Sequence, residues 1–352
     1  MGWDVVIEPV DVGDPGHLDR TLAHLAVRTA SGRAAMGERH QPYTVAELRV
    51  DARPTTQHRC EHLVAVEHDA GQVVGAAELY FPLLDNTDHA FGQVDVLPQA
   101  RRRGVGSTLV EHLIERTRAE GRRAVTIESV AATEQISEQR QDAGTAFAVR
   151  HGFSLALANH RSDLDLPHGA ADLDEVLATV EAEVAMARPD RGYDVITCHG
   201  AVPPQWLDQR AVLAGRMTTD TPLGDLGIEP EAWDAARIRE RDQMAADQGR
   251  HLIETVAVER ATGHLAAATT LAFHPDHGEI AAQWDTLVLR EHRGHRLGMW
   301  VKAANLRALL AAFPQVRRVK TYNAVENSPM LRVNRAMGFR PVGVLTEWQK
   351  RW

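Results

Sequence analysis

The chain has 352 residues, more than one hydrophobic core usually organises, so we expect two domains. Its 44% hydrophobic and 25% charged residues are ordinary for a globular protein, and its net charge of −9 argues against a general nucleic-acid binder. No apolar run reaches membrane-spanning length and the N-terminal residues lack a signal-peptide pattern, so we expect a cytoplasmic protein without membrane association.

The positions of the cysteines and histidines indicate neither disulfide bonds nor a metal site. Cys60 and Cys198 lie far apart, one in each half, which indicates no disulfide framework and fits a reducing compartment. The 18 histidines are scattered, and no cluster of cysteines or carboxylates accompanies them along the sequence. We therefore expect no metal site.

The first half mixes strand and helix patterns. Thr44 with Glu47 three residues later is a capping-box start for a short helix, and the turn at residues 69–71 predicts a hairpin. The apolar periodicity predicts strands over residues 3–10, 63–67, 73–81, 91–97, 124–130 and 153–158. It predicts helices over residues 18–30, from residue 44, from the turn at 101–106 to residue 121, and at 146–150.

The second half repeats this order after a connecting segment. Residues 166–191 are a predicted linker with an acidic helix over 173–186, which separates a domain at 1–165 from one at 192–352. Pro230 suits the first position of a helix over 231–247. Strands are predicted over 193–198, 251–259, 264–273, 279–289, 316–322 and 339–347, with further helices over 205–217, 299–312 and 330–337.

A basic, glycine-bearing turn follows a strand and opens a helix in each half. In the first half it reads Arg101-Arg-Arg-Gly-Val-Gly106, and aligning Arg101 with Arg293 brings Gly106 onto Gly298. Backbone N–H groups at a helix start, together with arginines, bind phosphate oxygens, so the turn predicts a pyrophosphate ligand. The spacing is neither that of a P-loop nor that of a dinucleotide-binding fingerprint, which argues against ATP and NAD as ligands of this turn.

The turn at residues 101–106 has the spacing Arg-x-x-Gly-x-Gly, which resembles the acetyl-CoA signature of the GNAT superfamily of acyl-CoA N-acyltransferases. The repeated element order and the junctions His151-Gly-Phe153 and Met337-Gly-Phe339 strengthen this resemblance. Each half resembles a GNAT domain, and the pair resembles tandem GNAT proteins. The fold implied is α+β (mixed α/β), with two tandem domains that each hold a mostly antiparallel twisted sheet flanked by helices.

The resemblance implies acetyl-CoA as co-substrate, with pantetheine in the gap where the fourth strand leaves the fifth and pyrophosphate on the turn. The implied cofactor residues are Val96, Leu97, Arg101, Arg102, Arg103, Gly104, Val105 and Gly106 in the first half, and Leu287, Val288, Leu289, Arg293, Gly294, His295, Arg296, Leu297 and Gly298 in the second. Arg296 replaces the first glycine, and it either adds a phosphate-contacting cation or blocks close approach. The family's cofactor-contacting asparagine is implied at Asn323 or Asn327.

Candidate catalytic residues favour the second half. The tyrosine that usually protonates the thiolate is replaced by Ala148 and Asn334, and Tyr322 at a strand end is a possible substitute. Carboxylates on the strand before each turn are candidate bases: Asp285 and Glu279, with Glu254 on the neighbouring strand, and Asp95 and Glu78 as first-half counterparts. We favour Asp285, because an apolar surrounding would bury it and raise its pKa. Polar residues 323–334, Asn334 included, place the expected active site in the C-terminal half.

These residues predict an enzyme, an acyl-CoA-dependent N-acyltransferase that moves an acetyl group to a primary amine of a small molecule by direct attack. A mycothiol-synthase-like acetyltransferase is a second reading. A non-catalytic acyl-CoA-binding regulatory module is the alternative from another class, given the two missing tyrosines. The expected partner is a small-molecule amine rather than a nucleic acid or a membrane, and the chain is expected to be a monomer or a homodimer.

Overall fold

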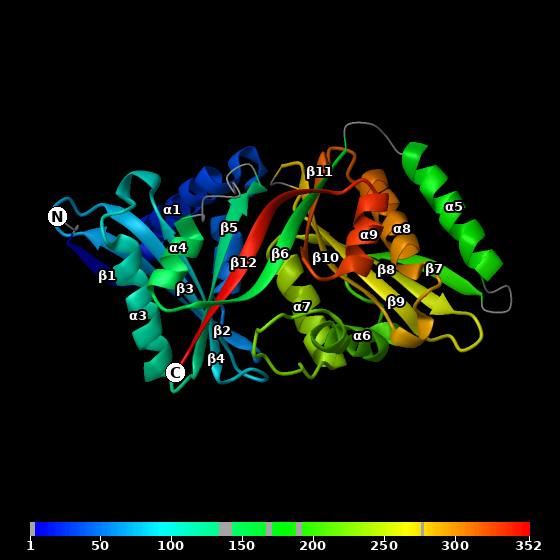
Figure 1. Cartoon of the computed structure of the whole chain (residues 1–352), viewed down its shortest axis with the longest axis horizontal. Coiled ribbons are helices and arrows are strands. Elements are labelled where there is room, and N and C mark those ends of the chain that lie inside the picture. Colours follow the sequence, from blue (N-terminus) through cyan, green and yellow to red (C-terminus); the bar gives the residue numbers. More distant parts are fainter. Residues whose placement is uncertain (1–3, 134–142, 167–170, 188–191, 276–277) are drawn as a thin grey trace. The chain divides into compact units, whose positions relative to one another are not determined.

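The computed structural model describes residues 4–133, 143–166, 171–187, 192–275 and 278–352, so parts of the predicted linker, at 167–170 and 188–191, lie outside the described residues. The chain divides into two compact units (Figure 1). The first unit comprises residues 1–159, 223–229 and 343–352. The second comprises residues 160–222 and 230–342.

The first unit is a sheet with helices on both faces. Its strands are β1 (Val5–Val10), β2 (His58–Glu67), β3 (Val73–Pro82), β4 (His89–Val96), β5 (Ala124–Ala132) and most of β12 (Arg340–Arg351), adjacent in that order. Its helices are α1 (Leu18–Met36), α2 (Val45–Asp51), α3 (Val105–Ala119) and α4 (Ala143–Arg150). Strands β4 and β5 pair in parallel, whereas the pairs β1–β2, β2–β3, β3–β4 and β5–β12 are antiparallel.

Alternation along the strands separates two faces of this sheet. Leu63, Leu79 and Ile127 point to the α3 face, where they pack with Leu109 and Leu113 in the main core. Their neighbours His62 and Glu78 therefore point to the opposite face, which α1 covers. The α3 face is apolar, whereas the α1 face carries titratable side chains.

The second unit has the same plan. Its strands are part of β6 (Ser154–Asp165), β11 (Arg318–Ala324), β10 (Ile280–Val288), β9 (Leu265–Phe273), β8 (His251–Glu259) and β7 (Tyr193–His199), adjacent in that order. Its helices are α5 (Ala171–Ala187), α6 (Leu207–Asp220), α7 (Ala235–Asp247), α8 (Leu297–Ala312) and α9 (Ser328–Ala336). Helix α8 packs on β8 and β9 with α5 beside it, and α6 and α7 also contact the sheet.

The predicted fold class is confirmed: a mixed α/β chain with a mostly antiparallel sheet. The capping box of Thr44 and Glu47 is present at the start of α2. One helix start differs from the prediction, because α7 begins at Ala235 with Asp234 as N-cap, so Pro230 lies before the helix. The Asp234 side chain accepts a hydrogen bond from the Arg237 N–H, which is the stronger start signal.

Part of the last strand of each half belongs to the other unit, which the sequence does not predict. Residues 343–351 of β12 pair antiparallel with β5, from Gly343 opposite Ala132 to Arg351 opposite Ala124, and so complete the sheet of the first unit. Residues 160–165 of β6 belong to the second unit, where the Leu166 N–H donates to the Arg317 carbonyl at 2.8 Å. The sequence-based division at 1–165 and 192–352 stays a prediction, and the compact units differ from it at these two strands.

Helix α8 buries a lysine. Lys302 is 1% exposed, and its Nζ lies 5.2 Å from the centre of the Phe339 ring. Burial lowers the pKa of Lys302 from 10.5 to about 7, because the apolar surrounding disfavours the ammonium. The aligned position in α3 is Val110, which is fully buried.

Replacing Lys302 with methionine is expected to raise the free energy of unfolding by a few kcal/mol at and below about pH 7. Between pH 7 and 10.5 the unfolded wild-type chain binds more protons at this group than the folded chain, so wild-type stability rises with pH. The gap between variant and wild type should therefore close toward pH 10.5. Urea unfolding at several pH values measures it, with Lys320→Met as control. A gap that does not change with pH would contradict the expectation.

Candidate active site

Two parallel strands part in each unit. In the first unit β4 pairs with β5 only from His89 opposite Ala124 to Gly92 opposite Ile127, although β4 continues to Val96. In the second unit β10 pairs with β11 only from Ile280 opposite Arg318 to Ala282 opposite Lys320, although β10 continues to Val288. Each unit thus has a gap between two strands, just before its glycine-bearing turn.

The turns after these strands are built alike. The Arg101 Nε donates to the Val96 carbonyl at 3.2 Å, and the Arg293 Nε donates to the Val288 carbonyl at the same 3.2 Å. The N–H groups of Leu97 and Leu289 donate at 3.0 Å to Val74 and Ala266, which are also equivalent. Because four equivalent residues repeat the same contacts, the two turns are structural copies.

Arg296 takes the conformation of the glycine that it replaces. Gly104 is the N-cap of α3 with φ 94°, and Arg296 is the N-cap of α8 with φ 57°, so both are left-handed. A side chain in this conformation costs about 1–2 kcal/mol relative to the right-handed form. Arg296 therefore preserves the shape of the turn, and its guanidinium contacts Glu183 on α5.

The start of each helix fits a diphosphate. The first N–H groups of a helix have no partner within it, and they point at whatever lies beyond the N-terminus. A Cβ on Gly298 would meet only Val288 Cγ2 at 3.6 Å, and a Cβ on Gly106 would come within 3.2 Å of Phe147. The atoms nearest to either added Cβ belong to side chains rather than to the backbone. Phosphate oxygens can therefore approach these N–H groups closely.

The arginines of the two turns differ in their partners. The Arg101 Nη2 donates to the Ser31 hydroxyl at 3.2 Å, a neutral partner. In the second unit, Arg293 and Arg290 lie 2.8 and 3.0 Å from the Asp220 carboxylate. Although burial works against it, the hydrogen bond and charges of these arginines lower the pKa of Asp220. A diphosphate in the second unit must share its arginines with Asp220 and Glu183, whereas the Arg101 Nη2 bonds a neutral hydroxyl.

Strand β10 carries a β-bulge and β4 does not. The register with β9 shifts between Gln283 and Thr286, so Trp284 and Asp285 fall outside the paired register, and the Asp285 carbonyl accepts instead from the Thr269 hydroxyl of β9 at 3.1 Å. Strand β4 pairs with β3 without a shift from Val96 to Phe91. A bulge frees backbone groups from the ladder and turns a side chain out of its alternation. The second unit therefore has a register shift and a carboxylate beside its strand gap.

A buried arginine lies under this bulge. Arg210 on α6 is 1% exposed, its Nε bonds the buried Glu254 carboxylate, and its Nη2 lies 3.4 Å from the Asp285 Oδ2. The Asp285 side chain is 40% exposed. The expectation that Asp285 is buried is wrong, because the bulge turns it outward and only its inner edge meets Arg210. The sequence reasoning missed Arg210, for which the linear pattern of α6 carries no signal.

The other predicted catalytic residues lie in different places. Glu279 is exposed and precedes β10, at the end far from the bulge, so it does not join Asp285. Tyr322, 39% exposed, lies on β11 beyond the last residue paired with β10, so it borders the strand gap. Asn334 is buried, and its Nδ2 donates to the Asn323 Oδ1 at 2.6 Å. Asn327 caps α9 by accepting from the Met330 N–H.

Several predicted cofactor residues have side chains that serve the fold. Leu287, Leu297 and Val105 are at most 5% exposed and pack in the cores, so any contact with a ligand would involve their backbone. The N–H groups of Leu97 and Leu289 are already bonded, which directs the proposed pantetheine contact to Val96 and Val288. The remaining residues of the two turns, Arg102, Arg103, Gly104 and Gly106, and Gly294, His295 and Gly298, stay predictions.

The strand register also changes one predicted equivalence. In the aligned frame that places Arg101 on Arg293, the counterpart of Asp285 is Gln93 rather than Asp95. Asp95 lies two residues further along β4, is 8% exposed, and has its pKa raised by burial. The first unit therefore has an amide where the second has a half-exposed carboxylate.

Comparison with known proteins identifies the fold. Residues 29–153 match the acetyltransferase (GNAT) family. The chain is similar over 99% of its length to 98% of a tandem GNAT protein from the clavulanic acid biosynthesis pathway, with 26% identity and a TM-score of 0.72. The first unit carries a GNAT acetyltransferase domain, and the chain has the tandem GNAT fold.

More distant solved structures share this tandem GNAT fold. A GCN5-related N-acetyltransferase from Sphaerobacter thermophilus is 15% identical, with a TM-score of 0.62, and the match covers 99% of this chain and 95% of that one. N-myristoyltransferase of Saccharomyces cerevisiae, solved with myristoyl-CoA, is 10% identical, with a TM-score of 0.57 and coverage of 98% and 78%. No curated protein matches the chain by sequence.

GNAT acetyltransferases, the family that residues 29–153 match, transfer acyl groups from CoA thioesters to amines of small molecules or proteins. The strand gap and the glycine-bearing turn of each unit are compatible with such a thioester. Among the described residues, no helix of the tandem GNAT chain has the length and apolar character to cross a membrane.

Proposed function

We propose that the protein is an acyl-CoA-dependent N-acyltransferase, with acetyl-CoA as donor and a primary amine of a small molecule as acceptor, and that the second unit carries out the transfer. The observation that supports this assignment is the bulge of β10, which lies beside the strand gap and carries the half-exposed Asp285. No equivalent shift occurs in β4.

The proposed reaction is a direct attack. The amine nitrogen bonds to the thioester carbonyl carbon, and the carbon–sulfur bond breaks as the tetrahedral intermediate collapses. Backbone N–H groups freed by the bulge at Trp284 and Asp285 stabilise the oxyanion, because donors fixed in advance need no reorganisation. Asp285 accepts the proton of the ammonium through a water molecule. Tyr322, at the edge of the gap, gives a proton to the leaving thiolate and takes up the second proton that the attacking nitrogen loses as the amide forms.

A carboxylate at the acceptor position favours a cationic amine. The outer part of Asp285 is open, because its side chain is 40% exposed while Arg210 holds the inner edge. An ammonium ion gains a charge-assisted hydrogen bond there, which is stronger than a neutral one. The net charge of −9 also speeds the encounter with a cation.

The first unit is a second candidate for the transfer or for acyl-CoA binding without turnover. Its turn has the complete Arg-x-x-Gly-x-Gly spacing, and the Arg101 Nη2 donates to a neutral hydroxyl rather than to a carboxylate. The buried Ala148 stands where the family has its tyrosine, which favours binding without turnover in this unit. The same absence in the second unit keeps a non-catalytic acyl-CoA-binding module as the alternative.

Paired turn variants test the proposal. Gly298→Glu places a carboxylate at the start of α8, and Gly106→Glu does the same at α3. CoA binding by calorimetry should weaken at the altered turn by at least about tenfold, since like charges meet where phosphate binds. Thiol release from acetyl-CoA with a panel of amines should fall in Gly298→Glu only. Ala119→Glu and Ala312→Glu add the same charge at the far ends of α3 and α8 and serve as controls.

The opposite result would assign the transfer to the first unit. Loss of thiol release in Gly106→Glu, with Gly298→Glu unaffected, contradicts the proposed site but keeps the enzyme. CoA binding without thiol release for any amine favours the binding module. No CoA binding by the wild type would reject the function itself.

A further inference from the structure

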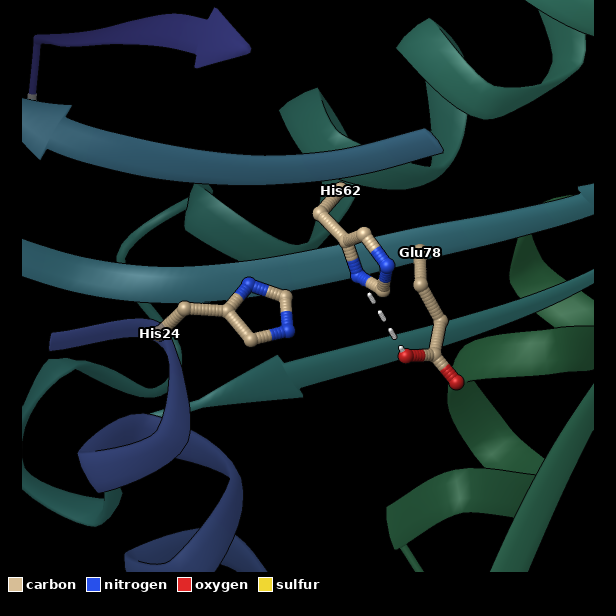
Figure 2. A group of neighbouring side chains, drawn as sticks. All are labelled: His24, His62 and Glu78. Carbon is tan, nitrogen blue, oxygen red and sulfur yellow. Dashed lines mark ion pairs between the residues drawn. The ribbon is translucent and has the colours of Figure 1, made fainter. Parts of the chain in front are cut away.

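Three side chains from separate elements meet on the α1 face of the first unit. His24 comes from α1, His62 from β2 and Glu78 from β3, and one ligand atom of each lies within 4.8 Å of the others. Figure 2 shows the two imidazoles and the carboxylate turned toward one another. The two strand residues are directly opposite in the β2–β3 register, so the sheet itself places them side by side.

The tautomer of His24 is fixed by the backbone. Its Nδ1 lies 3.1 Å from the Leu63 carbonyl oxygen, which only accepts, so Nδ1 carries the hydrogen. The Nε2 of His24 then presents a lone pair, and this buried atom has no hydrogen-bond partner. A ring N–H donated to a backbone carbonyl, with the other nitrogen free, is the usual arrangement of a metal-binding histidine.

His62 also has ring nitrogens without a hydrogen-bond partner. It is 5% exposed, and neither ring nitrogen has a hydrogen-bond partner, although Nδ1 lies 3.8 Å from the Glu78 Oε2. Leaving such polar atoms buried without a partner is unfavourable. Burial lowers the pKa of His24 to about 3 and that of His62 to about 4.

Arg28 is the cation nearest to this cluster. Its Nη1 donates to the Glu78 Oε2 at 2.7 Å, and its Nη2 donates to the Gln93 Oε1 at 3.1 Å. A carboxylate oxygen has a second lone pair, so Glu78 can accept from Arg28 and still face the imidazoles. The guanidinium repels a bound dication, so the expected affinity is below that of a site without a neighbouring positive charge.

We propose that His24, His62 and Glu78 form a binding site for a divalent late first-row metal ion, with Zn²⁺ as the best fit. Two imidazole nitrogens and one carboxylate oxygen suit this class of ion, and they leave one position open. Bonds of about 2.0–2.2 Å require the ligand atoms to close by up to roughly 1.4 Å. Mg²⁺ and Ca²⁺ prefer oxygen ligands and are disfavoured. The Glu78 side chain is 27% exposed and offers an entry route.

Metal titration of the whole protein tests this site. After removal of bound metals by a chelator, calorimetry with ZnCl₂ should detect one site per chain that His24→Ala, His62→Ala and Glu78→Gln each weaken at least about tenfold. Zn²⁺ should raise the Tm of the wild type and not that of these variants, because a ligand stabilises only the state that binds it. Co²⁺ should give the absorption of a four-coordinate ion, and MgCl₂ should have no effect.

A matched control separates this cluster from the other histidines. His58 lies on the same strand β2, is 7% exposed and stacks on Tyr80 at 4.7 Å, but it is not in the cluster. His58→Ala should keep the zinc response. Circular dichroism checks the fold, and His62→Gln replaces His62→Ala if the alanine variant unfolds. Equal zinc affinity in the wild type and the ligand variants, or no zinc binding by the wild type, would overturn the proposal. Neither outcome depends on acyl transfer.

Discussion

Replacing Asp285 with asparagine is expected to lower kcat/KM for the acceptor amine by about 10²–10⁴, the usual contribution of a positioned general base. Asparagine keeps the shape of the side chain and its contact with Arg210, but it neither accepts the amine proton nor carries the charge that attracts an ammonium. The Kd for CoA should not change, because the turn at residues 293–298 is untouched. Steady-state thiol release and calorimetry measure the two effects separately.

A surface aspartate of the same unit gives the control for this prediction. Asp194 pairs with Arg260 at 2.9 Å and its side chain is 53% exposed, so Asp194→Asn changes the net charge equally and should leave kcat/KM within about threefold. If Asp285→Asn behaves like this control, Asp285 is not the base, and the carboxylates of the first unit become the candidates.

Replacing Arg210 with methionine is expected to destabilise the protein by about 3–5 kcal/mol. Arg210 and Glu254 are 1% and 3% exposed, so the variant removes the cation that directly bonds the buried Glu254 carboxylate. Arg241 stays 3.8 Å from Glu254 but bonds Asp242 at 2.7 Å, and the Thr270 hydroxyl that donates to Glu254 does not offset a buried charge. Urea unfolding followed by circular dichroism measures the loss.

A double variant distinguishes pairing from packing. Arg210→Met combined with Glu254→Gln removes both charges, and it should recover most of the stability that the single change loses. If the losses of the two single variants add in the double variant, the pair is not coupled and the role of Arg210 is to fill space. A coupling energy also supports the reading that Arg210 positions Asp285, since both carboxylates contact one guanidinium.

Local sequence patterns correctly predicted features that depend on residues close together in the chain, such as turns and helix starts. The spacing of residues 101–106 predicted a turn that opens a helix, and the capping box at Thr44 predicted the start of α2; both are present. The alignment of Arg101 with Arg293 predicted a repeat, and the two side chains make the same bond to the preceding strand. Such features depend on residues only a few positions apart, so a single sequence carries them.

Contacts between distant residues could not be predicted in this way. Arg210 meets Asp285 only because α6 lies over the bulge of β10, and the bulge itself is a register shift that no residue type announces. His24, His62 and Glu78 looked like scattered residues, because nothing in the sequence states that α1 covers β2 and β3. The extent of the strands was likewise shorter in prediction, since β2 begins at His58 rather than at residue 63.

The exchange of last strands makes the maturation of the first unit depend on the synthesis of residues 343–351. These residues pair with β5, so a nascent chain that has emerged only to the linker still has an open edge on this sheet. That edge remains able to pair wrongly until residues 343–351 have left the ribosome. A gene split between the two halves would encode a first half that lacks the strand next to β5. The two halves therefore cannot be separated in evolution as freely as two independent domains.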